Sequence, residues 1–198
     1  MRNTLKGTLT EENLLKAFAG ESQARMRYNY FASQASKDGY EQIAAVFNTT
    51  ADQEKEHAKR FFKYLEGGKA TIHHATFPAG VIASTRENLL AAAEGEHEEC
   101  DMLYKEFAET ASAEGFAKVA NTFRLIAEVE KEHERRYLKL LGRLTDGDFF
   151  RRDGEIMWQC RNCGYIVRAS AAPKLCPSCE HDRKYFEPMA DNYYRLAE

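Results

Sequence analysis

The sequence is short of proline, of long apolar runs and of excess charge. It has four prolines in 198 residues, and the first 145 residues contain only Pro78, so long helices can form there. No apolar run approaches the roughly 20 residues that cross a bilayer, and none follows the basic residues of the N-terminus, as a secretory signal would require. The formal net charge of −3 gives no reason to expect binding to nucleic acid or to an anionic membrane. We therefore expect a cytoplasmic protein.

Cysteine is also scarce, and four of the five cysteines form two Cys-x-x-Cys pairs with twelve residues between them: Cys160, Cys163, Cys176 and Cys179. In a reducing compartment this pattern indicates metal binding and not disulfides. Four thiolates form a tetrahedral site for zinc or for a single iron. The spacing alone does not choose between them, so a structural zinc ribbon stays an alternative. The fifth cysteine, Cys100, stands alone and is expected to be a small core residue.

Helical periodicity predicts four long helices, at residues 10–35, 40–65, 84–113 and 116–144. Thr10 is expected to cap the first helix, and Ser84 or Thr85 the third. The composition changes near residue 147, where prolines and cysteines become frequent. We predict a helical domain over residues 1–147, a linker over 148–155, and a small β-rich metal domain over 156–198 that includes a C-terminal tail.

The two halves of the helical region repeat each other. The segment from Asn13 to Glu21 matches the one from Asn88 to Glu96 at an offset of 75, and Glu54-Lys-Glu-His57 matches Glu130-Lys-Glu-His133 at an offset of 76. Two helical hairpins joined by a long crossover make the ferritin-like form of the four-helix bundle. The predicted fold class is therefore an all-α ferritin-like four-helix bundle with a long crossover, followed by a small β-rich metal domain.

Each predicted helix carries a glutamate in the middle of its apolar stripe: Glu21, Glu54, Glu96 and Glu130. An unpaired buried carboxylate costs several kcal/mol, and four in one core also repel one another. Cations must neutralise these acids, or the acids must hold protons.

His57 and His133 favour metal cations. Each follows its glutamate by three residues and so lies on the same helix face. One glutamate from each of two helices, with Glu-x-x-His from each of the other two, is the ligand set of di-iron and di-manganese bundles. Oxygen-rich ligation with one imidazole per metal suits iron or manganese better than zinc or copper. A single Glu-x-x-His would usually be a solvated face that forms ion pairs, but two copies in register predict a two-metal centre.

The second half has one more inward acid than the first. Glu99 lies one turn after Glu96, where the first half has Ala24. A surplus ligand can make two metals inequivalent and can exchange on and off one of them; the alternative is a partly exposed acid in a charged run. Tyr28 and Tyr104 lie on the faces of Glu21 and Glu96 and are candidate hydrogen-bond donors to ligands, or else ordinary core aromatics.

The order of these motifs resembles the rubrerythrin family over about residues 5–187. The resemblance includes the segment Ala19-Gly-Glu-Ser-Gln-Ala-Arg25, the loop Phe77-Pro-Ala-Gly80, the Cys-Gly-Tyr and Cys-Pro-x-Cys knuckles and all expected metal ligands. The bundle ligands that match are Glu21, Glu54, His57, Glu96, Glu99, Glu130 and His133. Glu180 follows the last cysteine, where free-standing rubredoxins commonly have glycine, and the tail from residue 189 lies beyond the resemblance.

The resemblance implies two non-haem irons in the bundle and one iron at the cysteines. It implies that Glu54 and Glu130 bridge the irons, that Glu21 binds the first, and that Glu96 and His133 bind the second. The first iron is expected to switch between Glu99 when oxidised and His57 when reduced.

The activity that the resemblance implies is the reduction of hydrogen peroxide to water. The electrons are expected to come from a reductase or a rubredoxin through the one-iron domain. A homodimer is expected, in which the cysteine site of one subunit serves the bundle of the other. Protons are expected from Tyr28, Tyr104 or Glu99. The alternatives are a ferritin-like ferroxidase that handles iron, an electron-transfer protein, and a binding module with a zinc ribbon.

Overall fold

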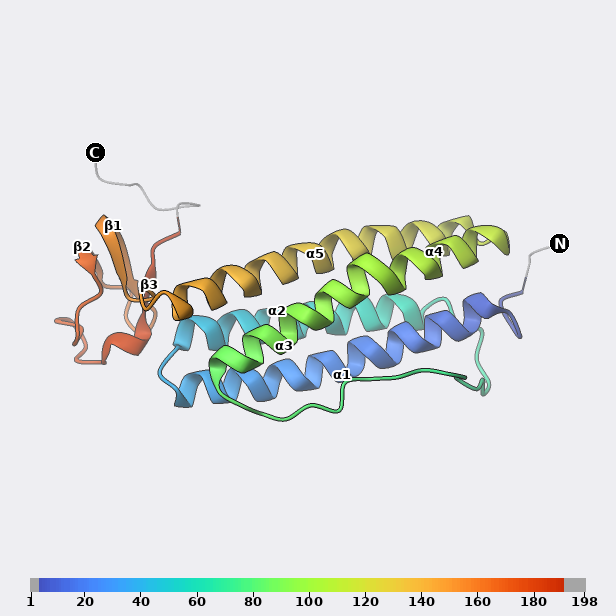
Figure 1. Ribbon diagram of the computed structural model, residues 1–198, viewed down its shortest axis with the longest axis horizontal. Helices are drawn as coiled ribbons and strands as arrows, with labels where there is room; N and C mark the ends of the chain where they lie inside the picture. The colour runs from blue at the N-terminus through green and yellow to red at the C-terminus, as the bar shows by residue number, and fades with distance from the viewer. Residues whose placement is uncertain (1–3, 191–198) are drawn as a thin grey trace.

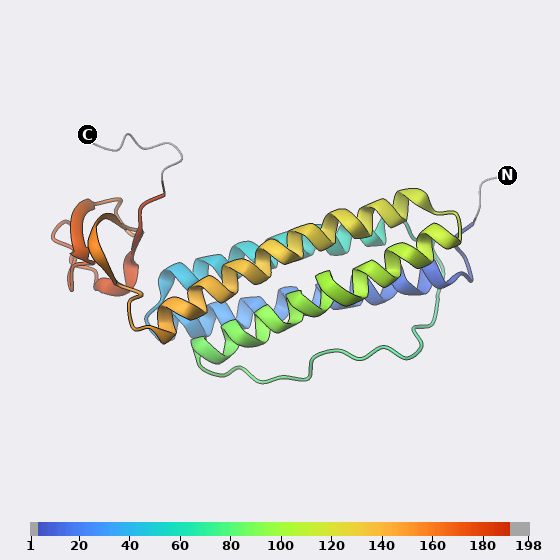
Figure 2. The ribbon, with the colours of Figure 1, turned by 45° about the horizontal axis from the view of Figure 1, so that its top comes forward.

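The computed structural model describes residues 4–190, which form a long helical bundle with a small sheet domain at one end (Figure 1). The bundle elements are α1 (Leu9–Lys37), α2 (Glu41–Phe62), α3 (Thr85–Glu98), the π-helical segment η1 (Glu99–Leu103), α4 (Tyr104–Ala113) and α5 (Ala117–Thr145). Helix α1 packs against α2, and the rod formed by α3, η1 and α4 packs against α5. The connection between α2 and α3 runs along the outside of the bundle (Figures 1 and 2). This arrangement confirms the predicted ferritin-like bundle with a long crossover.

The third rod differs from the prediction of one continuous helix. The segment Glu99–Leu103 is a π-helix between α3 and α4, and π-turns of this kind occur mostly at functional sites. Because the extra residue of a π-turn shifts the helical phase, it changes which side chains after Glu99 point inward. Periodicity read at 3.6 residues per turn has no means of detecting such a shift.

The prediction that Thr10 caps the first helix was wrong. Thr8 is the N-cap, and its hydroxyl accepts a hydrogen bond from the amide of Glu11. Ser84 caps α3 as predicted, in a full capping box with Glu87.

Thr10 and its repeat equivalent, Thr85, instead join one hairpin to the other. The amide and hydroxyl of Thr10 both donate to Glu114 in the α4–α5 loop, at 2.8 and 2.5 Å. Those of Thr85 both donate to Asp38 in the α1–α2 loop, at 2.9 and 2.7 Å. Each loop acid thus binds the first turn of the other hairpin, where the helix dipole favours negative charge.

We expect Glu114→Gln to lower the free energy of unfolding by about 1 kcal/mol at pH 7, as the loss of a helix cap does. Burial alone would raise the pKa of Glu114, but the hydrogen bonds from Thr10 and Leu9 outweigh it and lower the pKa below its ordinary 4.5. A lowered folded-state pKa stabilises the fold above the unfolded-state pKa, and this contribution is lost as the pH falls through the folded value. Urea unfolding at pH 7 and pH 3 should show the difference between wild type and variant shrinking at the lower pH. An equal difference at both would contradict the charged cap.

The bundle core is divided into two apolar clusters with polar side chains between them. One cluster contains Phe61, Tyr104 and Phe123, and the other contains Phe47 and Tyr137, all nearly inaccessible to solvent. Along each rod, the acid that the repeat singled out lies between the residues of the two clusters. Aromatic packing therefore holds the acids at the middle of the bundle from both sides.

The small domain is a three-stranded antiparallel sheet in the order β2–β1–β3, with β1 (Arg151–Cys160), β2 (Ile166–Ala171) and β3 (Phe186–Pro188). Trp158 and Phe186 form its core with Cys160 and Cys176. Strand β1 begins inside the stretch predicted as a linker, since Arg151 already pairs with Ala171 across an irregularity in the register. The division at residues 148–155 stays our proposal. None of the helices in residues 4–190 is both long and apolar enough to cross a membrane.

Candidate metal centres

Six of the seven predicted bundle ligands meet at the middle of the bundle in two overlapping groups. One group is Glu21, Glu54, His57 and Glu130, and the other is Glu54, Glu96, Glu130 and His133. Within each group, one ligand atom from every residue lies within 4.8 Å of the others. The four glutamates are at most 1% exposed. The side chains that the helix phases turn inward thus lie together in the structure, and their role as metal ligands stays a proposal.

Glu54 and Glu130 belong to both groups because each faces both histidines. His57 Nδ1 lies 2.9 Å from Glu54 Oε2 and 2.8 Å from Glu130 Oε1. His133 Nδ1 lies 3.0 Å from Glu54 Oε1 and 2.8 Å from Glu130 Oε2. Each of these carboxylates therefore presents one oxygen to each side, which is the arrangement of a bridging ligand.

Glu21 and Glu96 occupy the two ends. Glu21 lies on the His57 side, with Oε1 3.8 Å from His57 Nδ1, and Glu96 lies on the His133 side, with Oε1 3.7 Å from His133 Nδ1. The centre therefore has two terminal carboxylates, two shared carboxylates and two imidazoles.

The protonation of these groups shows how much positive charge the cluster requires. Burial would lower the pKa of both histidines, but the surrounding carboxylates outweigh it and raise the pKa of His57 to about 10 and that of His133 to about 12. Burial raises the pKa of Glu96 to about 8, and burial with the charges of Glu130 and Glu54 raises that of Glu21 well above its ordinary value. Protons must therefore neutralise the acids wherever metal cations do not, and metal binding must displace them.

The hydrogen bonding of the cluster fits metal ligation. Six buried side-chain atoms in it make no hydrogen bond of good geometry: Glu21 Oε2, Glu54 Oε1, Glu96 Oε2, both carboxylate oxygens of Glu130 and His133 Nδ1. Four of them have only the ion-pair contacts between histidine and carboxylate described above, and Glu21 Oε2 and Glu96 Oε2 have no hydrogen-bond partner. Buried polar atoms without partners are rare in folded proteins and each costs free energy. All six belong to residues of the two groups, so two cations bound there would give these atoms partners. The donor set of oxygens with one imidazole per side suits iron.

The two candidate tyrosines both donate to terminal carboxylates. Tyr28 donates to Glu96 Oε1 at 2.7 Å and Tyr104 to Glu21 Oε1 at 2.5 Å. Each tyrosine thus contacts the acid of the opposite half, and not the one on its own helix. Gln53 also supports the centre, because its Oε1 lies 3.0 Å from His133 Nε2. Sequence reasoning gave Gln53 no role, since its side chain reaches His133 across α2 and α5 and no pattern within one helix indicates such a contact.

Glu99 lies beside the two groups but outside them, at the wall of a cavity of about 210 Å³. Gly20, Arg27 and Tyr104 line the same cavity, with Phe77 from the crossover connection. Glu99 Oε1 lies 3.5 Å from the place where a side chain at Gly20 would begin. Burial and the nearby carboxylates raise the pKa of Glu99 well above its ordinary value, although Arg27 opposes them. The surplus carboxylate therefore lies near the carboxylates of the cluster and also at the wall of this cavity, which none of the six clustered ligands lines.

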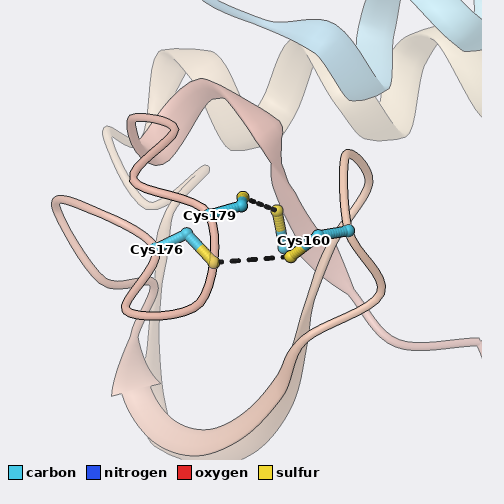
Figure 3. A group of neighbouring side chains, drawn as sticks. Cys160, Cys176 and Cys179 are labelled. Carbon is cyan, nitrogen blue, oxygen red and sulfur yellow. Dashed lines mark hydrogen bonds between the residues drawn. The ribbon is translucent and has the colours of Figure 1, made fainter.

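The four cysteines of the small domain form the second centre. Their sulfurs all lie within 4.8 Å of one another, with Cys160 and Cys179 3.8 Å apart and Cys163 and Cys176 3.7 Å apart. Four sulfurs in a tetrahedron at metal distances of roughly 2.3 Å lie roughly 3.8 Å apart. Figure 3 shows the side chains of Cys160, Cys176 and Cys179 turned toward a common centre. The site fits one tetrahedral metal ion.

The backbone at the two cysteine pairs follows one pattern. Gly164 donates its amide to the carbonyl of Cys160 at 2.8 Å, and Glu180 donates to that of Cys176 at 2.9 Å. Both residues have a left-handed backbone, with φ of 78° and 59°. Glutamate in this conformation is strained relative to glycine. Despite this strain, Glu180 keeps the same turn as Gly164, so glutamate in place of the usual glycine leaves the four cysteine ligands in position. The C-terminal tail from residue 191 lies outside the described residues.

Comparison with known proteins finds matches over both domains. The family model described as rubrerythrin matches residues 12–141, and the one described as rubrerythrin, rubredoxin-like domain, matches residues 158–187. The chain is 63% identical to a rubrerythrin of Porphyromonas gingivalis over 98% of this chain and 96% of that protein. It is 51% identical to a rubrerythrin of Nitratidesulfovibrio vulgaris over 96% of this chain and 99% of that one.

Solved structures agree. A structure of nigerythrin in its fully reduced, all-ferrous state aligns with a TM-score of 0.61 and 29% identity over 95% of this chain and 89% of that chain. A bacterioferritin of Desulfovibrio desulfuricans, whose structure describes a di-iron site, aligns with a TM-score of 0.61 over 70% of this chain and 81% of that chain. Its identity is 23%, so it bears on the fold alone.

Proposed function

The chain belongs to the rubrerythrin family of di-iron oxidoreductases, and from that premise we propose that it is a peroxidase that reduces hydrogen peroxide to water and protects against oxidative stress. The reaction takes one peroxide, two electrons and two protons and yields two waters. The cofactors are the two irons of the bundle and the one iron of the four-cysteine site. When bound, the bundle irons supply electrons and Lewis acidity.

The observation that carries the proposal is the position of Glu99. The six clustered residues already give each side of the centre a terminal carboxylate, two shared carboxylates and an imidazole, so Glu99 is a surplus acid. Glu99 lines the cavity next to the cluster, while His57 lies inside the cluster, 2.8 Å from Glu130. We propose that Glu99 and His57 alternate as ligands on the Glu21 side, according to the oxidation state. Such an exchange suits a centre that gives up two electrons at once and is then reduced again.

The cavity supplies a place for the substrate. Its volume is about 210 Å³, whereas one water molecule occupies about 30 Å³ of the liquid. The cavity is therefore large enough for a molecule as small as hydrogen peroxide. Glu99 and Tyr104 line it, so they are placed to deliver protons to a bound oxygen. Tyr28 lies on the Glu96 side of the centre and is proposed to hold that carboxylate in position as well as to donate protons.

The electron supply is proposed to come from a reductase or a rubredoxin through the cysteine site. Fifteen residues of α5 separate Glu130 from the helix end at Thr145, which at 1.5 Å per residue is roughly 22 Å. The sheet domain lies beyond that end (Figure 1), so the cysteine site of the same chain is far from the bundle centre. We therefore propose a homodimer in which the cysteine site of one subunit serves the other subunit's bundle. We also propose that the protein acts in the cytoplasm, since paired cysteines that serve as metal ligands are typical of a reducing compartment.

The test is anaerobic stopped-flow mixing of the fully reduced, iron-loaded protein with peroxide and, separately, with dioxygen. Oxidation of the bundle irons is expected to be faster with peroxide. Glu99→Ala should keep its bundle iron, because six ligands remain, but react at least tenfold more slowly. Glu94→Ala, at an exposed position of α3 that does not line the cavity, should match the wild type. Faster oxidation by dioxygen, with growth of a ferric mineral, would support iron handling instead and reject the peroxidase.

Tyr104→Phe is expected to slow peroxide reduction by about tenfold to hundredfold, the usual effect of removing a hydrogen bond to a metal ligand. The variant loses both the donor to Glu21 and a proton source on the cavity wall, so its solvent isotope effect should change with its rate. Tyr30→Phe, at an exposed position, is the matched control. An unchanged rate and isotope effect in Tyr104→Phe would remove this residue from the mechanism.

A further inference from the structure

Another group of potential ligands lies on the other face of the α3–η1 junction, outside the two-metal centre. His97 ends α3, Cys100 lies in η1, and Glu134 extends from α5. The three residues present an imidazole nitrogen, a thiol sulfur and a carboxylate oxygen that all lie within 4.8 Å of one another. None of the three is among the bundle or cysteine-site ligands described above.

The separations match the edges of a metal coordination polyhedron. His97 Nδ1 lies 3.1 Å from Glu134 Oε1, and Cys100 Sγ lies 3.9 Å from Glu134 Oε2. Tetrahedral zinc ligands at the usual bond lengths lie roughly 3.4 Å apart for nitrogen and oxygen and roughly 3.6 Å apart for sulfur and oxygen. The two contacts go to different oxygens of Glu134, so one ion between the three residues would be held by both oxygens of this carboxylate, or by one of them after a small turn of its side chain.

The surroundings combine a fixed thiol with access from solvent. Cys100 is 7% exposed, whereas the side chain of His97 is 58% exposed and that of Glu134 is 20% exposed. The group opens into a surface groove of about 350 Å³ whose walls include two further acids, Asp101 and Glu128, and three cationic residues, Lys105, Arg124 and Lys131. An ion can therefore reach the site from water, and its remaining coordination position can keep a water molecule.

We propose that His97, Cys100 and Glu134 form a third metal site, specific for a borderline-soft divalent cation of which zinc is the representative. One thiolate, one imidazole and one carboxylate are zinc ligands, whereas magnesium and calcium require oxygen ligands throughout. Binding releases the thiol proton to solvent and involves no electron transfer.

The site has a structural consequence, because it ties η1 to α5. Cys100 lies in the π-helical segment, between Glu99 and Tyr104. Both of these residues are among those that line the cavity beside the bundle centre. A cation held by Cys100 and by Glu134 of α5 fixes this segment against the helix that carries Glu130 and His133. Occupancy should therefore raise the thermal stability, and above the dissociation constant the gain should grow with the logarithm of the zinc concentration, as for any ligand of the folded state.

The experiment uses the full chain with iron loaded at the bundle and at the cysteines, so that those ligands are already taken. Zinc is added, and zinc and iron contents are measured after equilibrium dialysis. We expect one zinc per chain with no loss of iron, and a zinc X-ray absorption spectrum with one sulfur at roughly 2.3 Å. Cys100→Ser and His97→Ala should each weaken zinc binding at least tenfold.

Glu134→Gln and Glu128→Gln form the matched pair, since both remove one carboxylate charge from the same groove and only Glu134 is a proposed ligand. Zinc affinity should fall in the first and stay unchanged in the second. Because His97 is mostly exposed, its variant separates loss of a ligand from loss of folding. The proposal is overturned if zinc binds the Cys100→Ser and His97→Ala variants as tightly as the wild type, if the spectrum shows no sulfur, or if zinc enters only by displacing iron.

Discussion

Glu130→Ala is expected to abolish iron binding in the bundle and to reduce peroxide turnover by more than a hundredfold. Glu130 presents one oxygen to each side of the centre, so, with Glu130 as the proposed bridge, its loss should remove a ligand from both irons together. Removal of a group that merely supports a ligand costs about 10- to 100-fold, and a shared ligand should cost more. Iron analysis of the purified variant and turnover with peroxide and a reductase measure both effects.

The same substitution should not destabilise the metal-free bundle by a comparable amount. Burial and the charge of Glu130 raise the pKa of Glu21, and removing that charge relieves the repulsion, whereas the lost contacts with His57 and His133 act in the opposite direction. We expect thermal unfolding of the metal-free variant near the wild-type temperature, with no further rise when ferrous iron is added. The control is Glu132→Ala, an exposed acid on the same helix. Full iron occupancy in Glu130→Ala would show that Glu130 is not a bridging ligand.

Cys176→Ser is expected to remove the iron of the small domain and to stop turnover that depends on the reductase. Cys176 is fully buried in the domain core with Trp158 and Phe186. A domain of about 40 residues has too small a core to be stable without its metal. The red colour of ferric iron bound by four thiolates should disappear, and amide exchange in β1–β3 should become fast.

The bundle should still react in this variant. When its irons are reduced chemically, peroxide should oxidise them at the wild-type rate, because the two-metal centre lies in a separate core. Ser178→Ala, which changes an exposed residue between Cys176 and Cys179, should keep the colour and the turnover. Wild-type turnover by colourless Cys176→Ser would mean that electrons reach the bundle by another route.

The ligands in the bundle could be predicted because a helix relates residues three and four apart in a fixed way. Once Glu54 and His57 are assigned to one helix, they must share a face, and the 75- and 76-residue repeat places their counterparts opposite. The four cysteines are equally local, since each Cys-x-x-Cys pair closes its own turn. In both centres the residue types and their spacing along the chain therefore indicate which side chains lie together.

The contacts between rods were not predictable in this way. The support of His133 by Gln53, the caps of Glu114 on Thr10 and Asp38 on Thr85, and the group around Cys100 all join residues from separate elements. No periodicity within one segment relates such residues, because their meeting depends on how far one rod is shifted and rotated against the next.

The sequence by itself determined the helical class, the inward acids and histidines and the cysteine knuckles, since each follows from the periodicity of a single segment. Only the tertiary structure decided that Glu54 and Glu130 are shared between two groups, that each tyrosine donates to the acid of the opposite half, and that a π-turn leaves Glu99 at a cavity beside the centre. The reason is physical. Dispersion and burial act on the packing of the rods as a whole, and this packing decides which carboxylate lies between two groups and which side chains a π-turn brings to a cavity.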